Sequence, residues 1–237
     1  MSLLTLIQDA ADRLGVVRPS SVVGSADQQV RQLLALAQQE GKELARRYPW
    51  QVIVKEKTFS ATATETQSSV IPSDFDRFVP ETFYNRTAKR YVEGPLNAQE
   101  WQNYKASTTN IISDAFRVRG DSLLMAPTPT ADDSYAFEYI SLWWCTTTGG
   151  TTPTLAAWAS DSDVGILPEE LMTLGVVWRF LRAKGLDYAE AFRTYEAQLM
   201  LRAARDGGKR TLNMGRSHDF RGPYYPQFPD GSWSGLS

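Results

Sequence analysis

Side chains of the types needed for catalysis occur late in the sequence, but in arrangements that do not make a site. Ser217, His218 and Asp219 are the residue types of a hydrolytic triad, and they are adjacent within a glycine-rich stretch. The members of a triad converge from separate elements onto a rigid support, which three sequence neighbours do not do. Residues 231–235 read Gly-Ser-Trp-Ser-Gly and place Trp233 where a nucleophile elbow requires serine. We therefore predict no serine nucleophile.

Carboxylates in close pairs could bind a metal ion or act in acid–base chemistry. Asp161 and Asp163 have the spacing that begins a calcium loop, but Ile166 and Met172 stand where that loop needs glycine and glutamate. We interpret this pair as the acidic start of a helix, which complements the positive end of the helix dipole. It predicts no metal site.

Two further acidic pairs receive a similar interpretation. Glu169 and Glu170 follow Pro168 at a predicted helix start, and adjacent helix residues point about 100° apart, so they do not face one substrate. Asp74 and Asp76 are a third pair without a catalytic signature. These carboxylates leave one enzyme alternative open, a carboxylate-dependent hydrolase acting on cell-wall glycan. We assign no catalytic residue.

The sequence contains one cysteine and one histidine. These counts exclude a disulfide framework, iron–sulfur sites, and zinc centres built from several cysteines or histidines. Cys145 follows Trp143 and Trp144 in an apolar stretch, which predicts a buried, unreactive thiol. No Walker or dinucleotide glycine motif is present, so we predict no metal and no cofactor.

The formal net charge is −2, from 25 basic and 27 acidic residues, whereas a dedicated nucleic-acid binder shows a basic excess. Two basic clusters occur, one in a predicted turn and one across a predicted helix end: Arg86, Lys89 and Arg90, and Arg202, Arg205, Lys209 and Arg210. Neither interleaves cations with aromatic residues, as single-strand binders do. A nucleic-acid-binding module is thus a weaker alternative, and we expect any DNA contact to be transient.

Periodicity and capping signals divide the chain into helical and β-like parts. Apolar residues at helical spacing predict helices over residues 2–14 and from a capping box at 25–28 to about residue 47. A further helix begins at Pro168, and another begins after Asp187. Between them, alternating patterns predict strands over 51–59 and 134–144 and a hairpin that turns at Gly120-Asp121.

Three shorter segments complete the prediction. Extended residues on either side of 85–87 predict a turn, and cap spacing from Asn97 to Glu100 predicts a short helix over 98–106. Residues 60–69 are small and polar, and we expect a loop there.

The last segment, residues 207–237, has six glycines, three prolines and almost no aliphatic residues. Such a composition cannot build a core of its own. It nevertheless carries five aromatic residues: Phe220, Tyr224, Tyr225, Phe228 and Trp233. Aromatic side chains on such a segment are suited to ordering against a partner's surface. The alternative is that this segment folds back over its own domain.

These elements predict an α+β protein. Residues 1–49 and 168–206 are expected to form an antiparallel helical bundle from the N- and C-terminal helices, and residues 50–145 a β-rich inserted subdomain. Residues 146–167 are expected to be a linker, and residues 207–237 an extended C-terminal arm. The first residues lack the basic start of a signal peptide and no run is long enough to span a bilayer, so we expect cytoplasmic synthesis and no membrane partner.

Several of these segments resemble the head-to-tail adaptor (connector) proteins of tailed bacteriophages. The residues that carry the resemblance are Leu3–Gly15, Gly41–Trp50, Ile71–Phe78, Phe116–Asp121 and Gly185–Glu190. The resemblance spans most of residues 1–206, and the order of helices, β insertion, helices and arm is similar as well.

The resemblance implies a structural virion protein at the head–tail junction, made in the host cytoplasm. It implies a homo-oligomeric ring, commonly of twelve copies, that sits below the portal protein, extends the DNA channel and docks the tail or nozzle protein. The arm and its five aromatic residues would then bind the portal, and double-stranded DNA would pass without specific binding. A stopper or tail-completion protein is the main alternative.

Overall fold

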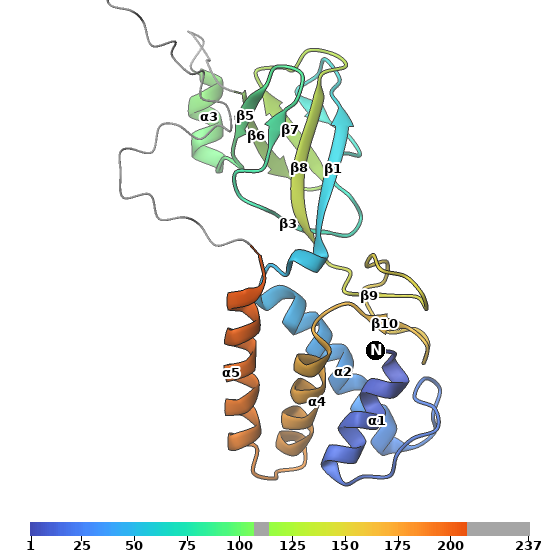
Figure 1. Ribbon diagram of the computed structural model, residues 1–237. Coiled ribbons are helices and arrows are strands. Elements are labelled where there is room, and N and C mark those ends of the chain that lie inside the picture. The colour runs from blue at the N-terminus through green and yellow to red at the C-terminus, as the bar shows by residue number, and fades with distance from the viewer. Residues whose placement is uncertain (107–113, 208–237) are drawn as a thin grey trace, which may run out of the picture. The chain divides into compact units, whose positions relative to one another are not determined.

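The computed structural model describes residues 1–106 and 114–207 (Figure 1). This part of the chain is mixed α and β. Its helices are α1 Leu3–Leu14, α2 Gln28–Arg47, α3 Ala98–Ala106, α4 Glu169–Ala183 and α5 Ala189–Arg205. All five helices predicted from the sequence are therefore present.

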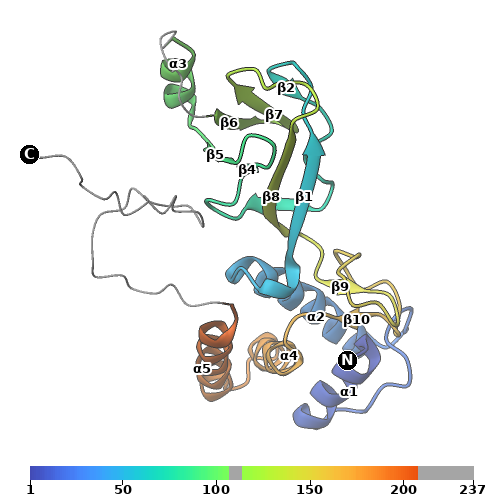
Figure 2. The ribbon, with the colours of Figure 1, turned by 45° about the horizontal axis from the view of Figure 1, so that its top comes forward.

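Helices from both ends of the chain pack on one another. The central helix is α4, which contacts α1, α2 and α5 (Figures 1 and 2). Eight of its residues are buried, among them Leu171, Val176 and Phe180, as expected for a helix that is apolar around most of its circumference. The shared core also contains Leu3 of α1 and Leu44 of α2.

The helix ends follow local capping chemistry. Ser2 caps α1, because its hydroxyl accepts a hydrogen bond from the Thr5 amide at 3.3 Å, and Gly15 ends the helix with a φ of 66°. The cap predicted at Ser25 is wrong. The Asp27 carboxylate caps α2 by accepting from the Gln29 amide at 2.7 Å, so the helix begins at Gln28.

The short helix α3 has the predicted capping box. Asn97 Oδ1 accepts a hydrogen bond from the Glu100 amide at 2.8 Å, and Glu100 Oε2 accepts one from the Asn97 amide at 2.9 Å. The α3 residue Trp101 is buried with Leu124 and Ala126 in a small cluster of its own.

The strands of the described chain form one large sheet and one small one. Their bounds are β1 Val54–Ser60, β2 Thr66–Gln67, β3 Phe75–Phe78, β4 Tyr84–Asn85, β5 Arg90–Glu93, β6 Asp114–Arg119, β7 Ser122–Ala126, β8 Ser134–Ser141, β9 Cys145–Thr146 and β10 Val164–Gly165. The eight-stranded sheet runs β1-β8-β4-β5-β6-β7-β2, and β3 also pairs with β8. Most pairs are antiparallel, but β5 and β6 are parallel.

The large sheet curls around an aromatic core. The ring centroid of Phe83, the residue before β4, lies 4.6 Å from that of Phe116 in β6 and 5.4 Å from that of Phe137 in β8, so Phe83 joins two strands that are not neighbours in the sheet. Phe78 of β3 also contacts Phe116, at 5.1 Å. Edge-to-face contacts of this kind contribute about 1 kcal/mol each beyond the burial of their area. The aromatic residues of this region therefore stabilise the β part of the chain.

Several strand predictions hold, with changes at their ends. The hairpin of β6 and β7 turns at Gly120, which has a φ of 59°, and β4 and β5 flank the predicted turn. Residues 51–53 form a 3₁₀ turn, so β1 begins at Val54. The loop predicted over residues 60–69 contains the short strand β2, which pairs with β7.

The segment 146–167 packs closely against the helices. Its strand β10 pairs with β9, and its side chains Trp158 and Leu167 belong to the helical core. Gln38 of α2 also donates a hydrogen bond from Nε2 to the Trp158 carbonyl oxygen at 2.9 Å. This connection is therefore a folded part of the helical region.

Candidate functional site

The two candidate calcium ligands both bind backbone amides. Asp161 Oδ1 accepts a hydrogen bond from Val23 N at 2.6 Å, and its Oδ2 accepts one from Val22 N at 3.0 Å. Asp163 is 3% exposed, and its Oδ2 accepts from the amides of residues 159 and 160, both at 2.7 Å. Within residues 1–106 and 114–207, no group of three or more histidine, cysteine, aspartate or glutamate side chains could hold a metal ion.

The interpretation of Asp161 and Asp163 as helix-start acids is wrong, since α4 begins at Glu169. The acids of its first turn are Glu169 and Glu170, as predicted for that pair. Glu169 Oε2 lies 3.3 Å from the Met1 amino nitrogen, and Glu170 Oε2 accepts from an Arg202 guanidinium at 2.9 Å. Each of these carboxylates therefore joins α4 to another segment.

Asp74, another of the predicted acid–base candidates, is buried, with 4% of its surface exposed. Its carboxylate accepts hydrogen bonds from Lys55 Nζ at 2.7 Å, Ser141 Oγ at 2.7 Å and Tyr139 Oη at 3.0 Å. Burial raises the pKa of Asp74, but the Lys55 and Ser141 hydrogen bonds, the Lys55 charge and the Tyr139 hydrogen bond outweigh it and lower the pKa. Lys55 also donates to the carbonyl oxygen of residue 153 at 2.9 Å. The cluster therefore ties the sheet to the segment that follows it.

Asp76 has a separate partner and borders a pocket. Its Oδ2 atom accepts from Arg77 Nη1 at 2.5 Å. The pocket is lined by Lys42, Ala45, Arg46, Asp76, Ser141, Leu142 and Ala156. Hydrolysis of a glycosidic bond by two carboxylates needs a facing pair, and this lining has one carboxylate, already paired with Arg77. The pocket thus does not have the arrangement that the hydrolase alternative requires.

Cys145 is fully buried, as predicted. Its Sγ atom donates to the Leu155 carbonyl oxygen at 3.2 Å. Burial, with a smaller contribution from the charge of Asp163, raises the pKa of the thiol to about 12. The thiol is therefore protonated at neutral pH and shielded from reagents in solution.

Three arginines of the predicted basic clusters have acidic partners. Arg90 makes a bidentate pair with Asp114, at 2.9 and 2.7 Å, and Arg86 pairs with Glu56. In the second cluster Arg202 pairs with Glu170, while Lys209 and Arg210 lie outside the described residues. Within residues 1–106 and 114–207, neither cluster presents a row of unpaired cations to phosphates.

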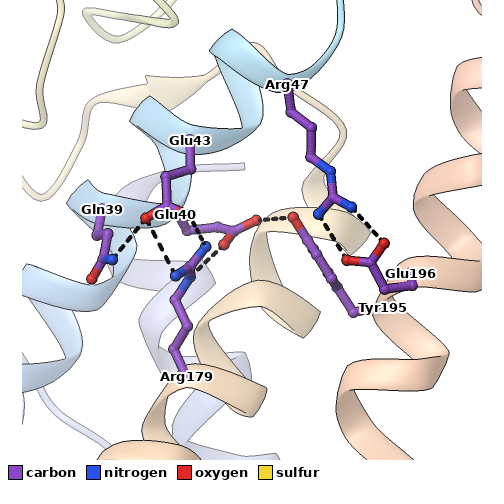
Figure 3. Close-up of polar contacts among 7 residues, drawn as sticks. All are labelled: Gln39, Glu40, Glu43, Arg47, Arg179, Tyr195 and Glu196. Atoms are coloured by element: carbon purple, nitrogen blue, oxygen red, sulfur yellow. Dashed lines mark hydrogen bonds and ion pairs between the residues drawn. The ribbon is translucent and has the colours of Figure 1, made fainter.

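A polar network that sequence reasoning missed lies among the helices (Figure 3). At its centre Glu40 of α2 is fully buried, with 0% of its surface exposed. Its Oε2 atom accepts a hydrogen bond from Arg179 Nε of α4 at 2.6 Å, and its Oε1 atom accepts one from the Tyr195 hydroxyl of α5 at 2.7 Å. One carboxylate therefore joins three helices.

The Arg179 guanidinium also reaches a second carboxylate. Its Nη2 atom donates to Glu43 at 2.7 Å, and Gln39 donates to the same carboxylate at 2.7 Å. Burial raises the pKa of Glu40, against the opposing effects of Tyr195 and Arg179. Burial also raises the pKa of Glu43, but the hydrogen bonds from Gln39 and Arg179 outweigh it, so that pKa is lowered. A buried charge is tolerated only with such partners.

A second ion pair joins α2 to α5 at the edge of this network. Arg47 donates to Glu196 through both terminal nitrogens, at 2.7 and 2.5 Å, as Figure 3 shows. The Arg47 side chain is 44% exposed and that of Glu196 is 21% exposed. This pair is therefore screened by solvent and contributes less than the buried one.

The sequence holds a signal for the network. Glu40 follows Ala37 and precedes Leu44 at the spacing of the apolar stripe of α2, so a charge stands in a core position. Within the apolar helix α4, Gly175 and Arg179 are four residues apart and thus lie on one face. A core acid in one helix and a glycine–arginine pair in another predict such a contact.

The described chain also exposes apolar side chains on its last helix. We define the α5 outer face as Ala197, Met200, Leu201 and Ala204, all of which are exposed. At about 100° per residue these positions point away from Tyr195 and Leu199, the buried residues of α5. Met200 is 68% exposed and Leu201 is 43% exposed. Adjacent exposed apolar residues of this kind are typical of interaction surfaces.

The five aromatic residues predicted to bind a partner lie outside the described residues, as do Ser217, His218 and Asp219. No helix within residues 1–106 and 114–207 combines the length and apolar character needed to cross a membrane.

The chain matches a known protein family over nearly its whole length. Residues 1–223 match the SU10 adaptor protein family, so the chain belongs to that family. It is therefore a phage adaptor protein, a structural component of the virion. No curated protein sequence matches the chain significantly. The family assignment confirms the resemblance seen in the sequence.

Proposed function

We propose that this protein is a head-to-tail adaptor that forms a ring, of twelve copies, below the portal. The ring extends the DNA channel and docks the tail or nozzle protein. The observation that carries the proposal is the match to the SU10 adaptor protein family over residues 1–223, which includes both helical parts and the sheet. An adaptor of this kind works by holding surfaces together and has no need of catalytic residues.

We further propose the division into parts that the sequence predicts. Residues 1–49 and 168–206 form the helical bundle domain, residues 50–145 the β-rich insertion and residues 146–167 the connection. Two separate core clusters support this division. One contains residues of α1, α2, α4 and α5, and it also takes in residues from both ends of the insertion and from the connection: Trp50, Ile53, Ile140, Trp144, Cys145, Trp158 and Leu167. The other contains Phe83, Phe116, Phe137 and their neighbours in the sheet.

The arm, residues 207–237, is proposed to bind the portal through Phe220, Tyr224, Tyr225, Phe228 and Trp233. Aromatic side chains buried in a partner's pocket each contribute on the order of 2 kcal/mol or more to binding. The paired state of Arg86, Arg90 and Arg202 supports passage of DNA without tight binding, because a channel of unpaired cations would hold the phosphates.

A binding assay with the immobilised cognate portal and, separately, the tail tube tests this function. Three proteins are compared: the full chain, a chain ending at Gly208, and a full chain with the five arm aromatics changed to serine. We expect the portal to retain only the full chain. The shortened chain keeps Asp206, which accepts a hydrogen bond from the Gln51 amide at 2.8 Å, so its circular dichroism should be unchanged.

Two results would contradict the proposal. Retention of the full chain by the tail tube and not by the portal would favour a stopper or tail-completion protein. Unfolding of the chain that ends at Gly208 would show that the arm covers its own domain, contrary to its assignment as a portal-binding segment.

A further inference from the structure

The pocket beside Asp76 combines apolar walls with two cations. Lys42 and Arg46 of α2 both line it. Its apolar lining comes from α2 and from the chain after β8, and consists of Ala45, Leu142 and Ala156. The pocket has a volume of about 200 Å³. Sites for cofactors and other small molecules span about 300–1,000 Å³, so this pocket, which we call the α2 pocket, suits a single side chain.

The two cations of the α2 pocket are not neutralised by the described chain. Lys42 and Arg46 are exposed, and neither has an ion-pair partner in the part of the chain that the structure describes. Asp76, the carboxylate of the lining, is paired with Arg77 at 2.5 Å. Of the α2 positions three or four residues from either cation, only that of Glu43 is acidic, and Glu43 belongs to the buried network around Arg179. Positive charge therefore exceeds negative charge at the pocket.

This arrangement does not serve the stability of the helix. Lys42 and Arg46 are four residues apart and lie on one face of α2, where two like charges destabilise a helix. Elsewhere among the helices, Arg47, Arg179 and Arg202 each have a carboxylate partner. A departure from local stability of this kind is typical of a functional site, and a ligand that carries the missing negative charge would account for it.

The lining suits a carboxylate side chain better than a phosphate. The apolar side chains of the wall can contact methylene groups, which aspartate and glutamate have and a phosphate lacks. One carboxylate can accept charge-assisted hydrogen bonds from Lys42 and from Arg46 together. The carboxylate of Asp76 in the same lining repels a doubly charged phosphate more than a singly charged carboxylate.

The position of the pocket favours the portal as the partner. The Tyr48 hydroxyl donates to the Asp206 carbonyl oxygen at 3.1 Å, and Asp206 Oδ2 accepts from the Gln51 amide at 2.8 Å. The residue that leads into the arm is therefore held at the end of α2 that also carries Arg46. A portal subunit that binds the arm comes close to this end of α2.

We propose that the α2 pocket binds an aspartate or glutamate side chain of the portal through Lys42 and Arg46. The inference rests on the proposed function and adds a charged contact to the aromatic contacts of the arm. A charged contact at a fixed place on the subunit sets the orientation in which the two proteins meet.

The affinity of the full chain for the immobilised cognate portal tests this contact. In Lys42→Gln/Arg46→Gln the dissociation constant should rise about tenfold or more, because two charge-assisted hydrogen bonds are lost. The midpoint of its urea unfolding should stay the same or rise, since the like-charge pair is gone. The matched control is Arg13→Gln/Arg31→Gln, which removes the same charge from two exposed arginines outside the pocket and should bind as wild type does.

Competition identifies the anion without any substitution. A tetraglutamate peptide should displace the wild-type chain from the portal more strongly than inorganic phosphate does at the same ionic strength. Stronger displacement by phosphate would overturn the assignment of a carboxylate to the pocket.

Three results separate the failure of this contact from the failure of the proposed function. Equal affinity of the wild type and Lys42→Gln/Arg46→Gln would overturn the contact while leaving the adaptor function intact. An equal loss of affinity in Arg13→Gln/Arg31→Gln would also overturn it, because net charge alone would then explain the loss. A wild-type chain that the portal does not retain would contradict the proposed function itself.

Discussion

Glu40 of α2 lies directly against Gly175 of α4. A Cβ atom at position 175 would stand 2.1 Å from Glu40 Cδ, so the space of a missing side chain holds the buried carboxylate. The two residues are 135 positions apart in sequence. The contact explains both the glycine within α4 and the room for a carboxylate in the core. Their contact lets α2 and α4 approach closely while Arg179 and Tyr195 neutralise and hydrogen-bond the carboxylate.

The first prediction concerns Gly175→Ala. In an isolated helix this change would stabilise the helix by about 1 kcal/mol, because alanine is the better helix former. Here we expect destabilisation of roughly 1–3 kcal/mol, since the new methyl group displaces Glu40. Urea denaturation of the full chain measures the difference. When Glu40 is already replaced by alanine, Gly175→Ala should lower the unfolding free energy by less. If Gly175→Ala stabilised the wild-type protein, the close packing of Glu40 against Gly175 would be contradicted.

The second prediction separates the buried from the exposed ion pair. Arg179→Met leaves Glu40 without its cation and should cost about 3–5 kcal/mol of unfolding free energy. Arg47→Met is the matched control and should cost about 1 kcal/mol or less, because its pair with Glu196 is solvent-exposed. Thermal and urea unfolding of both variants provide the comparison. Equal losses of unfolding free energy in the two variants would mean that the buried ion pair stabilises the fold no more than the exposed one.

The third prediction concerns acid stability through Asp74. Its pKa in the folded protein is below the unfolded value of about 3.9, so the ionised carboxylate stabilises the fold. That stabilisation is present above about pH 4 and is lost as the pH falls through the folded pKa. Asp74→Asn should therefore cost about 2 kcal/mol at pH 7, and its difference from wild type should shrink below about pH 4.

Urea denaturation at a series of pH values, from pH 7 to below about pH 4, measures how the unfolding free energies of wild type and Asp74→Asn change with pH. Asp76→Asn serves as the control, because the Asp76 side chain is 23% exposed and pairs only with its neighbour Arg77. That control should lose about 1 kcal/mol or less. If the difference in unfolding free energy between wild type and Asp74→Asn stayed constant from pH 7 to below about pH 4, the charge of Asp74 would not stabilise the fold.

The fourth prediction concerns Asp161 and metal ions. Because Asp161 binds two backbone amides, Asp161→Ala should cost about 1–3 kcal/mol and speed hydrogen exchange at Val22 and Val23. Adding calcium, or removing metals with EDTA, should leave the melting temperature of the wild-type protein unchanged. A calcium-dependent rise in melting temperature that Asp161→Ala abolishes would instead establish a metal site.

Local patterns predicted much of the secondary structure. The apolar stripes of α1 and α2, the Gly120 turn and the Asn97–Glu100 capping box are all encoded by residues within a few positions of one another. The α2 cap was misplaced because Ser25 and Asp27 both satisfy the capping rule, and local sequence does not choose between them.

The pairing of distant segments could not be predicted. Strand β1 pairs with β8, so that Val54 lies opposite Ile140, and the parallel pair β5–β6 has no turn signal at all. The role of Asp161 depends in the same way on a loop far earlier in the chain. Such contacts depend on tertiary packing, whereas the patterns used for prediction report only local periodicity.

Electron microscopy of the purified chain mixed with its cognate portal is the most direct test of the proposed ring. We expect a ring of twelve copies, coaxial with the portal and bound to the side that faces the tail. Particles in which the portal stays bare and the adaptor forms no ring would contradict it.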